Sequence, residues 1–446
     1  MKTFKGGIHP NDNKYITKDL AIEKVQTVPE MVYPVSQHLG APATPIVKVG
    51  DEIKMGQVIA EANGMISANV LSGVSGKVKA IEKRLDIGGN MSECIVIEND
   101  FLDNPIDNFG KKSNYLEFTN EEIINKIKEA GIVGLGGAGF PTHIKLSPKD
   151  PEKIDYILVN GAECEPYLTS DYRLMIEQSE KLLMGLKVVL KLFPNAKGRI
   201  CIEKNKPYAI KKLNDLVKDE KNIDVFPMET KYPQGGERQL IFVATNRKIN
   251  SSILPAMTGV IVDNVDTMIS IYNAICENTP LIRRIMTISG DCFNKVGNYE
   301  VRLGMDYQSL IDQVGGFCKT AKKIVSGGPM MGICIYNLQV PVAKNSSAVV
   351  SFSKDDSEEK TTSCINCGRC VDVCPENLLP TLMEKASKIL DYDKFNELYG
   401  MECIECGSCA YVCPAKRPLT QSFKIMKRKT GAYLKEKNKN TNGVKK

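Results

Sequence analysis

Eight of the fifteen cysteines in this 446-residue chain fall within two short motifs. Residues 364–375 read CINCGRCVDVCP and residues 403–414 read CIECGSCAYVCP, so each is a C-x2-C-x2-C-x3-C-P motif. Thiolates at this spacing are typical ligands of [4Fe–4S] clusters, and two adjacent copies predict two clusters. Zinc is the competing ligand of any C-x2-C pair, but the Cys-Pro that closes both motifs favours iron and sulfur. These cysteines therefore indicate one-electron transfer.

The last cysteine of each motif precedes a proline and turns toward the other cluster, which predicts crossed ligation. One cluster is expected on Cys364, Cys367, Cys370 and Cys413. The other cluster is expected on Cys403, Cys406, Cys409 and Cys374. The remaining seven cysteines are scattered along the chain, and we interpret them as packing residues.

A second candidate for chemistry is the glycine-rich stretch 131–146, GIVGLGGAGFPTHIKL. Glycine-rich backbone can approach a phosphate closely, and a lysine lies near its end. Its G-x-G-x-x-G pattern follows a predicted helix, so the usual dinucleotide-binding context is missing. Three polar segments strengthen the prediction of a nucleotide site against turn glycines and capping residues: NGAECEPYLTSDYR at 160–173, YPQGGERQLI at 232–241 and VIVDNVDTMIS at 260–270.

Alternating helix and strand signals surround these segments over residues 115–265. Helical spacing over 120–130 ends at a glycine, and apolar runs at 154–160 and 198–205 are typical of buried parallel strands. This alternation predicts a parallel sheet with helices on both faces. Residues 284–338 change to strand, turn, strand, helix, strand, which indicates a β-grasp module.

Residues 41–82 contain short β-rich pieces between glycine turns, which predict a small sandwich or barrel. The run VGDEIKMGQVIAE resembles the hairpins of biotinyl and lipoyl carrier domains, which carry their cofactor on a lysine at the tip. The corresponding turn here is Asn63-Gly64-Met65-Ile66 and has no lysine. We therefore expect a barrel-sandwich scaffold without a carrier role.

The composition, 42% hydrophobic and 25% charged, is typical of a soluble globular protein. No run reaches the length of a membrane span and MKTFKGGIHP has no apolar signal segment, so we expect neither secretion nor a membrane span. Much of the net charge of +6 comes from nine Lys/Arg against one Glu after residue 423. The remaining chain is slightly acidic, which argues against nucleic-acid binding. The basic end is expected to be disordered, or to meet anionic lipid or an acidic partner.

Taken together, the glycine loop, the three polar segments and the β-grasp order resemble the flavin- and NADH-binding subunit of respiratory complex I over about residues 115–340. The resemblance implies FMN against Gly136, Gly137, Ala138 and Gly139, with Phe140 toward NADH and Lys145 toward the FMN phosphate. It implies Asn160 and Glu163 on the flavin and Glu165 near NADH. It further implies Gly235, Gly236 and Glu237 beside the isoalloxazine, and Asp263, Asn264 and Thr267 at the ribityl-phosphate end. The chain departs from that family at Val133, Leu135 and Ala162, where arginines and an aspartate are usual.

The leader FKGGIHPNDNKYIT, the run QHLGAPATPIVKVGDEIKMGQVIAEANG, the loop GGAGFPTHIKL and the paired cysteine motifs resemble the RnfC family, a component of the Rnf complex, from end to end. The resemblance implies the NAD-site component of an ion-translocating ferredoxin:NAD+ oxidoreductase, with two [4Fe–4S] clusters, FMN and NAD(H). Its expected partners are the membrane and ferredoxin-like subunits of that complex, and ferredoxin indirectly. The expected location is peripheral, on the cytoplasmic side of the bacterial cell membrane, with Na+ or H+ as the coupled ion.

Nicotinamide gives up a hydride, whereas clusters accept single electrons, so the flavin is expected to connect the two and no side chain need act as a catalytic base. Two alternatives are a cobalamin reductase of a microcompartment and an electron-wiring scaffold without flavin. The GGIHP leader and the basic end favour the Rnf family over the first alternative. The presence of Lys145, Asn160 and Asn264 argues against the second.

The predicted fold class is multidomain, α/β plus β. We expect a barrel-sandwich hybrid over 1–112, a complex I flavoprotein-like Rossmann-type α/β domain for FMN and NADH over 113–270, and a soluble-ligand-binding β-grasp module over 271–345. A helical two-cluster ferredoxin-like domain is expected over 346–425, followed by a basic disordered tail over 426–446.

Overall fold

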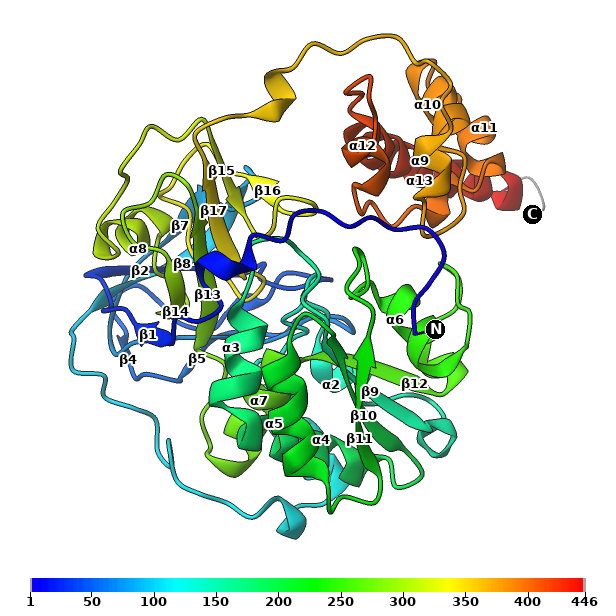
Figure 1. Cartoon of the computed structure of the whole chain (residues 1–446). Helices are drawn as coiled ribbons and strands as arrows, with labels where there is room; N and C mark the ends of the chain where they lie inside the picture. Colours follow the sequence, from blue (N-terminus) through cyan, green and yellow to red (C-terminus); the bar gives the residue numbers. More distant parts are fainter. Residues whose placement is uncertain (1, 444–446) are drawn as a thin grey trace. The chain divides into compact units, whose positions relative to one another are not determined.

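The computed structural model describes residues 2–443, and Figure 1 labels their helices and strands. The chain divides into two compact units. The larger unit contains Asp12–Pro227 and Pro255–Lys354. The smaller unit combines the residues up to Asn11, the segment Met228–Leu254 and the residues from Asp355 onward. The segment 228–254 of the expected FMN domain therefore groups with the cysteine motifs.

The N-terminal barrel consists of two antiparallel sheets, ordered β2-β8-β7-β4 and β3-β5-β6. Their bounds are β2 Glu30–Pro34, β3 Thr44–Pro45, β4 Glu52–Ile53, β5 Val58–Glu61, β6 Val70–Leu71, β7 Gly76–Leu85 and β8 Met91–Asn99. Met31, Tyr33, Ile95 and Ile97 are fully buried between them. Apolar side chains that alternate along short strands thus close a small core, as the glycine-punctuated sequence predicts.

The α/β sheet has the strand order β11-β10-β9-β12, and β9 pairs in parallel with both β10 and β12. The strands are β9 Tyr156–Gly161, β10 Lys197–Glu203, β11 Ile223–Met228 and β12 Val260–Asn264. The associated helices are α1 Asn120–Glu129, α2 Thr142–Lys145, α3 Ser170–Glu177, α4 Ser179–Leu192, α5 Pro207–Val217 and α7 Val265–Cys276. The chain proceeds outward from β9 to β11 and then returns beside β9 as β12. This reversal creates a topological switch point between β9 and β12, where open α/β sheets bind ligands.

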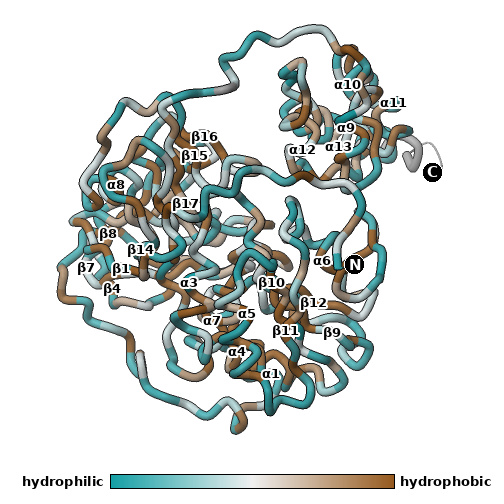
Figure 2. The backbone as a smooth tube through the Cα atoms, viewed as in Figure 1, coloured by the Kyte–Doolittle hydropathy of each residue, from teal (hydrophilic) through white to brown (hydrophobic). Residues whose placement is uncertain are grey.

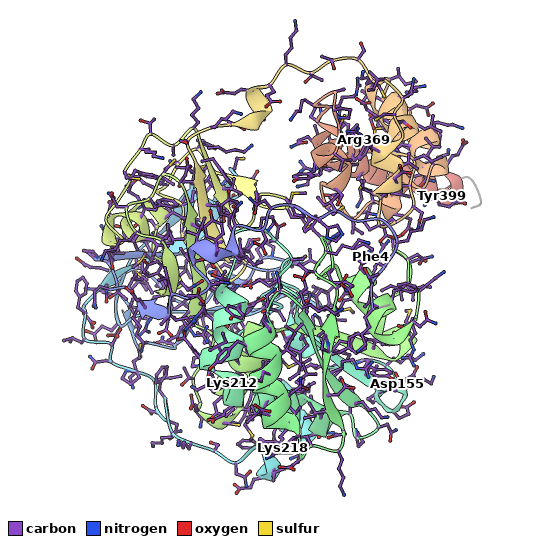
Figure 3. The ribbon with its side chains drawn as sticks, in the orientation of Figure 1. Phe4, Asp155, Lys212, Lys218, Arg369 and Tyr399 are labelled. Atoms are coloured by element: carbon purple, nitrogen blue, oxygen red, sulfur yellow. The ribbon has the colours of Figure 1, made fainter. Side chains whose placement is uncertain are left out.

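Helix packing on this sheet follows the apolar periodicity of the sequence. Figure 2 shows hydrophobic residues along α4 and α7, whose inner faces are buried. The two helices approach closely at Gly185, which has no side chain. A Cβ at this position would lie 1.9 Å from the carbonyl oxygen of Met268. On helix α5, the face opposite the buried residues is polar and exposes Lys212 (Figure 3). Hydrophobic residues on one helix face and lysines on the other explain the predicted layer arrangement.

The β-grasp sheet has the strand order β1-β14-β13-β17-β15-β16. Its elements are β1 Ile22–Lys24, β13 Arg283–Gly290, β14 Gly297–Arg302, α8 Tyr307–Gln313, β15 Lys323–Ser326, β16 Ile333–Cys334 and β17 Ala348–Phe352. The predicted order of strand, strand, helix and strand is present from β13 to β15. The sheet extends beyond the expected boundary at residue 345, because β17 pairs with both β13 and β15. It also takes β1 from the N-terminal arm, the segment 12–24.

The smaller unit is helical around the cysteine motifs. Its helices are α6 Glu237–Thr245, α9 Arg369–Asp372, α10 Pro380–Lys388, α11 Tyr392–Glu397, α12 Ser408–Tyr411 and α13 Leu419–Gly443. Short 3-10 helices along the chain are η1 Lys14–Ile16, η2 Tyr115–Glu117, η3 Pro151–Lys153, η4 Pro255–Thr258, η5 Asp356–Glu358 and η6 Gly400–Glu402. Met383, Phe395, Phe423 and Met426 form the apolar core of the helices α10, α11 and α13. No helix within residues 2–443 combines the length and the apolar content that crossing a membrane requires.

The basic end of the chain differs from our expectation of a disordered tail. Helix α13 continues to Gly443, and residues 444–446 lie outside the described part of the chain. Leu419, Phe423, Met426 and Thr430 recur at helical spacing and are buried. The helix is therefore amphipathic, a pattern that the surplus of lysines obscures in the sequence. Further along it, the side chains of Tyr433 and Lys437 both bond to Asp393 of α11, each at 2.8 Å.

Candidate functional site

Two cavities in the smaller unit are each lined by four cysteines. One cavity is lined by Cys364, Cys367, Cys370 and Cys413. The other is lined by Cys374, Cys403, Cys406 and Cys409. Each cavity takes three thiols from one motif and the last thiol from the other. This grouping matches the crossed grouping that the motif spacing predicts.

The two cysteine motifs also follow the same backbone path. The residue before the second cysteine, Asn366 or Glu405, has a φ of 56° or 58°. The glycine after it, Gly368 or Gly407, has a φ of 78° or 83° and begins a four-residue helix. Two left-handed residues around one cysteine turn the chain sharply, so the cysteines face one cavity. The two motifs therefore have the same local backbone conformation.

The thiols fit an iron–sulfur cofactor chemically. Burial raises the pKa of Cys403 to about 11, and burial also raises the pKa of Cys374, Cys406 and Cys409. A buried thiol favours its protonated form unless a cation stabilises the thiolate, and metal coordination does this. Each cavity has one buried cysteine, Cys370 or Cys406, whereas exposed cysteines, Cys364 and Cys367, line only the first cavity.

The segment with the predicted isoalloxazine contacts packs beside the second cavity. The hydroxyl of buried Tyr232 donates to the carbonyl oxygen of Cys406 at 2.6 Å. Arg238 and Gln239 donate to the carboxylate of Glu376, at 3.0 and 2.6 Å. Gly235, Gly236 and Glu237 lie between these anchors, and Gly236 is the N-cap of α6. A Cβ at Gly236 would lie 2.4 Å from the amide oxygen of Gln239, so a larger residue there would have to displace the Gln239 side chain.

In the larger unit, polar side chains meet at the topological switch point. Asn160 ends the apolar run of β9, Asn264 ends β12, and the two residues are paired in register. Their side chains leave adjacent strands at the carboxyl edge of the sheet, where ligands of this fold bind. Asn264 accepts the backbone N–H of Asp266 and donates to the carboxylate of Asp171 at 2.7 Å. Asn160 accepts the N–H of Ala162 at 3.3 Å.

The glycine loop passes over this edge and is fixed at both ends. The N–H of Leu135 donates to the hydroxyl of Thr267 at 3.0 Å, and the carbonyl oxygen of Leu135 accepts Arg284 at 2.9 Å. At the other end, the carbonyl oxygen of Gly139 accepts the N–H of Leu39 from the barrel at 3.1 Å. Between these anchors lie exposed Gly136, Gly137 and Ala138, whereas Gly139 is buried and Phe140 is half-buried. A rigid loop with an exposed glycine centre suits close contact with a flat or phosphorylated ligand.

Gly136 and Gly137 differ in what surrounds them. A Cβ at Gly137 would meet no atom within 4 Å, whereas one at Gly136 would lie 3.0 Å from the Cβ of Asn264. Gly136 thus packs on the switch point and Gly137 faces open space. Thr267 is fully buried and holds the loop, so its observed role is to position the glycines.

Lys145 lies at the same edge and neutralises a buried carboxylate. Its Nζ donates to Asp263 at 3.0 Å and to the carbonyl oxygen of Val262 at 2.7 Å. The Asp263 side chain is fully buried, and its second oxygen has no hydrogen-bond partner among the described residues. Burial raises the pKa of Asp263, and the neighbouring ammonium lowers it. Asp263 therefore orients Lys145, which keeps a cation beside Asn264 and the glycine loop.

The acidic loop that follows β9 separates its two carboxylates. Glu163 is buried, with its Oε1 accepting the N–H of Asp171 at 2.7 Å and its Oε2 lying 3.9 Å from Lys14. Burial raises the pKa of Glu163, against the lowering effect of Lys14 and Lys206. Glu165 instead turns its carboxylate to the backbone N–H groups of Met330 and Met331. The Glu163 side chain thus lies in the interior and bonds to the backbone of α3, and the flavin contact that the resemblance implies for this residue stays a prediction.

Two buried lysines support this acidic loop, although motif spacing predicts no role for either of them. Lys14 of the N-terminal arm donates to the carbonyl oxygens of Glu165 and Leu168. Lys206 donates to the carbonyl oxygen of Ala162 at 2.6 Å. The one available signal for Lys14 was its position within the leader motif FKGGIHPNDNKYIT. Its contact partners lie about 150 residues further along the chain, which spacing cannot reveal.

The site and fold define a flavoprotein of the complex I flavin-subunit type, with an iron–sulfur domain. Four stretches of the chain match models of known families. They are the Nuo51 FMN-binding domain over 127–273, the RnfC barrel sandwich hybrid domain over 2–102, the SLBB domain over 285–333 and the 4Fe-4S dicluster domain over 363–417. These matches confirm the predicted fold class. The chain belongs to the RnfC family of the Rnf complex.

Relatives that match over nearly their full length support the assignment to the RnfC family. The chain is 43% identical over 430 residues to the RnfC-type component of the proton-translocating ferredoxin:NAD(+) oxidoreductase complex of Clostridium ljungdahlii, covering 96% of this chain and 94% of the relative. It is 44% identical over 438 residues to the Na(+)-translocating counterpart of Acetobacterium woodii, covering 98% and 99%. These identities favour the Rnf family over a cobalamin reductase. An NAD+-reducing [NiFe]-hydrogenase, in its air-oxidised state, aligns with a TM-score of 0.49 at 16% identity over 65% of this chain and 55% of that chain, a likeness too weak to argue from.

Proposed function

We propose that this chain is the NAD-site subunit of an ion-translocating ferredoxin:NAD+ oxidoreductase. It holds FMN and two [4Fe–4S] clusters and carries electrons between NAD(H) and partner subunits. Those partners are membrane and ferredoxin-like subunits, which receive electrons from reduced ferredoxin and couple the transfer to Na+ or H+ movement. The chain lies peripherally on the cytoplasmic side of the membrane. The two relatives are named as subunits of ferredoxin:NAD(+) oxidoreductase complexes that translocate different ions, which supports the general reaction.

The convergence of three features at one sheet edge supports the FMN site. The exposed glycines Gly136 and Gly137, the cation Lys145 and the paired amides Asn160 and Asn264 surround the switch point. Backbone N–H groups and an ammonium suit a phosphate, and amide side chains suit a polyhydroxylated chain. The bound flavin would supply the exchange between two-electron and one-electron transfer. We assign Phe140 and Glu165 to the NADH side, and Gly235, Gly236 and Glu237 to the isoalloxazine.

The two four-cysteine cavities support the cluster assignment. Cys364, Cys367, Cys370 and Cys413 hold one cluster, and Cys374, Cys403, Cys406 and Cys409 hold the other. Tyr232 and Arg238 anchor the segment 232–241, which the family resemblance assigns to the isoalloxazine, beside the second cavity. The protein's side chains bind, orient and insulate these groups, and none acts as a catalytic base.

The test is anaerobic purification followed by flavin release, an iron count and titration with NADH. We expect about eight irons and one FMN per chain, with bleaching of the flavin by NADH. A Gly137→Val variant sharpens the test, because its side chain enters space that no protein atom occupies. It should keep its fold and iron and lose FMN, whereas Gly88→Val in the exposed β7–β8 turn should keep both. Wild-type protein with iron but without flavin would overturn the proposal.

A further inference from the structure

Glu165 is held at both of its ends by segments that are distant in the chain. Its carboxylate accepts the N–H of Met331 at 2.9 Å and the N–H of Met330 at 3.1 Å. Its carbonyl oxygen accepts the ammonium of Lys14 at 2.8 Å. The donors come from the β-grasp module and from the N-terminal arm. Neither the leader motif nor this β-grasp loop has another assigned role.

The β-grasp loop between β15 and β16, residues 327–332, is shaped to receive the carboxylate. Gly327 has a φ of +86°, and the N–H of Gly332 donates to the carbonyl oxygen of Gly328 at 2.8 Å. This turn aims the N–H groups of Met330 and Met331 at Glu165. A Cβ at Gly328 would lie 2.1 Å from the carboxylate oxygen Oε2. The seat therefore exists only while residue 328 is glycine.

The arm holds the other end through a buried ammonium. Lys14 is 6% exposed, and its Nζ also bonds to the carbonyl oxygen of Leu168. The carbonyl oxygen of Asp12 accepts the N–H of Tyr167 at 2.7 Å, so arm and loop are joined at a second point beside Lys14. Tyr167 has a φ of +70°, a conformation that bulky residues adopt only when their surroundings fix it. The arm thus determines the path of the loop that carries Glu165.

We propose that the N-terminal arm and the loop 327–332 are positioning elements for dinucleotide binding, and that they act through Glu165. The inference rests on the proposed function, which assigns Glu165 to the NADH side. A carboxylate fixed by two N–H groups and a held backbone loses little freedom when a hydroxyl or amide of the dinucleotide binds to it. Lys14, Gly328, Met330 and Met331 thereby contribute to affinity without touching the flavin.

The test uses the full chain with FMN and clusters bound. Gly328→Ala should displace the carboxylate and raise the Kd for NAD+ about tenfold, the loss of one hydrogen bond to a charged group. Calorimetric titration with NAD+ measures this without turnover. KM for NADH should rise with kcat unchanged, and FMN and iron contents should match wild type. Amide hydrogen exchange at Met330 and Met331 should accelerate. Gly88→Ala, in an exposed turn, is the control and should change none of these values.

The outcomes separate the inference from the proposed function. Wild-type holoprotein that does not bind NAD+ contradicts the proposed function. Gly328→Ala with faster exchange at both amides but wild-type Kd overturns the inference alone, as does a lower melting temperature without a change in Kd. If Gly328→Ala does not fold, Lys14→Met decides by the same measurements. Its Kd should rise, and Lys14→Arg should recover part of the affinity, because a cation again reaches the carbonyl of Glu165.

Discussion

Lys145 is the residue whose replacement best separates cofactor binding from folding. Its Nζ lies 3.0 Å from Asp263, whose side chain is fully buried, while the lysine side chain is 22% exposed. Removing one partner of a fully buried ion pair costs about 3–5 kcal/mol. Because solvent reaches this lysine, we expect Lys145→Met to lower the free energy of unfolding by about 2–3 kcal/mol.

The loss should depend on pH in a defined direction. Burial raises the pKa of Asp263 and Lys145 lowers it, so the variant has a still higher folded-state pKa. Below that pKa the folded variant binds a proton and the buried charge disappears. The stability difference from wild type should therefore be largest at about pH 8 and smaller at about pH 5. Urea unfolding of the apoprotein, followed by tyrosine fluorescence in a chain without Trp, measures both values.

The same variant tests the phosphate contact. Loss of a charge-assisted hydrogen bond of about 1.5–3 kcal/mol should raise the Kd for FMN roughly 10- to 150-fold, measured by flavin fluorescence. The double variant Lys145→Met/Asp263→Asn removes the unpaired buried charge, so it should recover stability but not FMN affinity. Lys153→Met is the matched control, because its pair with Asp150 is solvent-exposed and should cost below about 1 kcal/mol. Wild-type FMN affinity in the double variant would refute the phosphate role of Lys145.

Three further predictions follow from buried contacts. Burial raises the pKa of Asp171 to about 7. Between about pH 4 and pH 7 the folded protein therefore keeps a proton on Asp171 that the unfolded chain has lost. The free energy of unfolding should fall as the pH rises through that window. Asp171→Asn should flatten this profile in urea unfolding, and an unchanged slope would contradict the assignment. Cys374→Ala should remove the cluster of the second motif, leaving about four irons with the first cluster's signal in electron paramagnetic resonance; loss of the first cluster instead would contradict crossed ligation. Tyr232→Phe removes the hydrogen bond to the carbonyl of Cys406 and should shift the midpoint potential of one cluster only. Equal shifts of both clusters in a redox titration would count against that local effect.

Local sequence spacing predicts much of the fold because the relevant interactions are short-range. The helix expected over 120–130 is α1, with the capping box of Thr119 and Glu122 at its start and a left-handed Gly131 after it. The apolar runs at 154–160 and 198–205 correspond to β9 and β10. The cysteine grouping also follows from spacing, since a proline after each last cysteine directs the chain away from its own motif. In all of these, the deciding residues lie within a few positions of one another.

Long-range contacts were beyond prediction from spacing. Lys14 meets Glu165 across 151 positions, and Glu165 meets Met330 across 165. Gly235, Gly236 and Glu237 were expected within the FMN domain, yet their segment groups with the cysteine motifs because Tyr232, Arg238 and Gln239 bond to that unit. The error at α13 has a different origin. The prediction of disorder there rested on the surplus of lysines. One face of the helix is nevertheless buried through four side chains at helical spacing, Leu419, Phe423, Met426 and Thr430.

The sheet edge that we propose binds FMN depends on segments from every module of the larger unit. The barrel fixes Gly139 through Leu39, and the β-grasp strand β13 fixes Leu135 through Arg284. Buried Lys344, between β16 and β17, bonds to the carbonyl oxygens of Asn69 in the barrel and Gly131 at the start of the glycine-rich stretch. The FMN-type domain is therefore not self-sufficient, because the barrel and the β-grasp module hold its glycine loop. Because a misplacement of about 1 Å can strongly reduce the rate of a positioned reaction, we expect substitutions in the barrel or the β-grasp module that release the glycine loop to weaken the proposed FMN site even where they touch no cofactor.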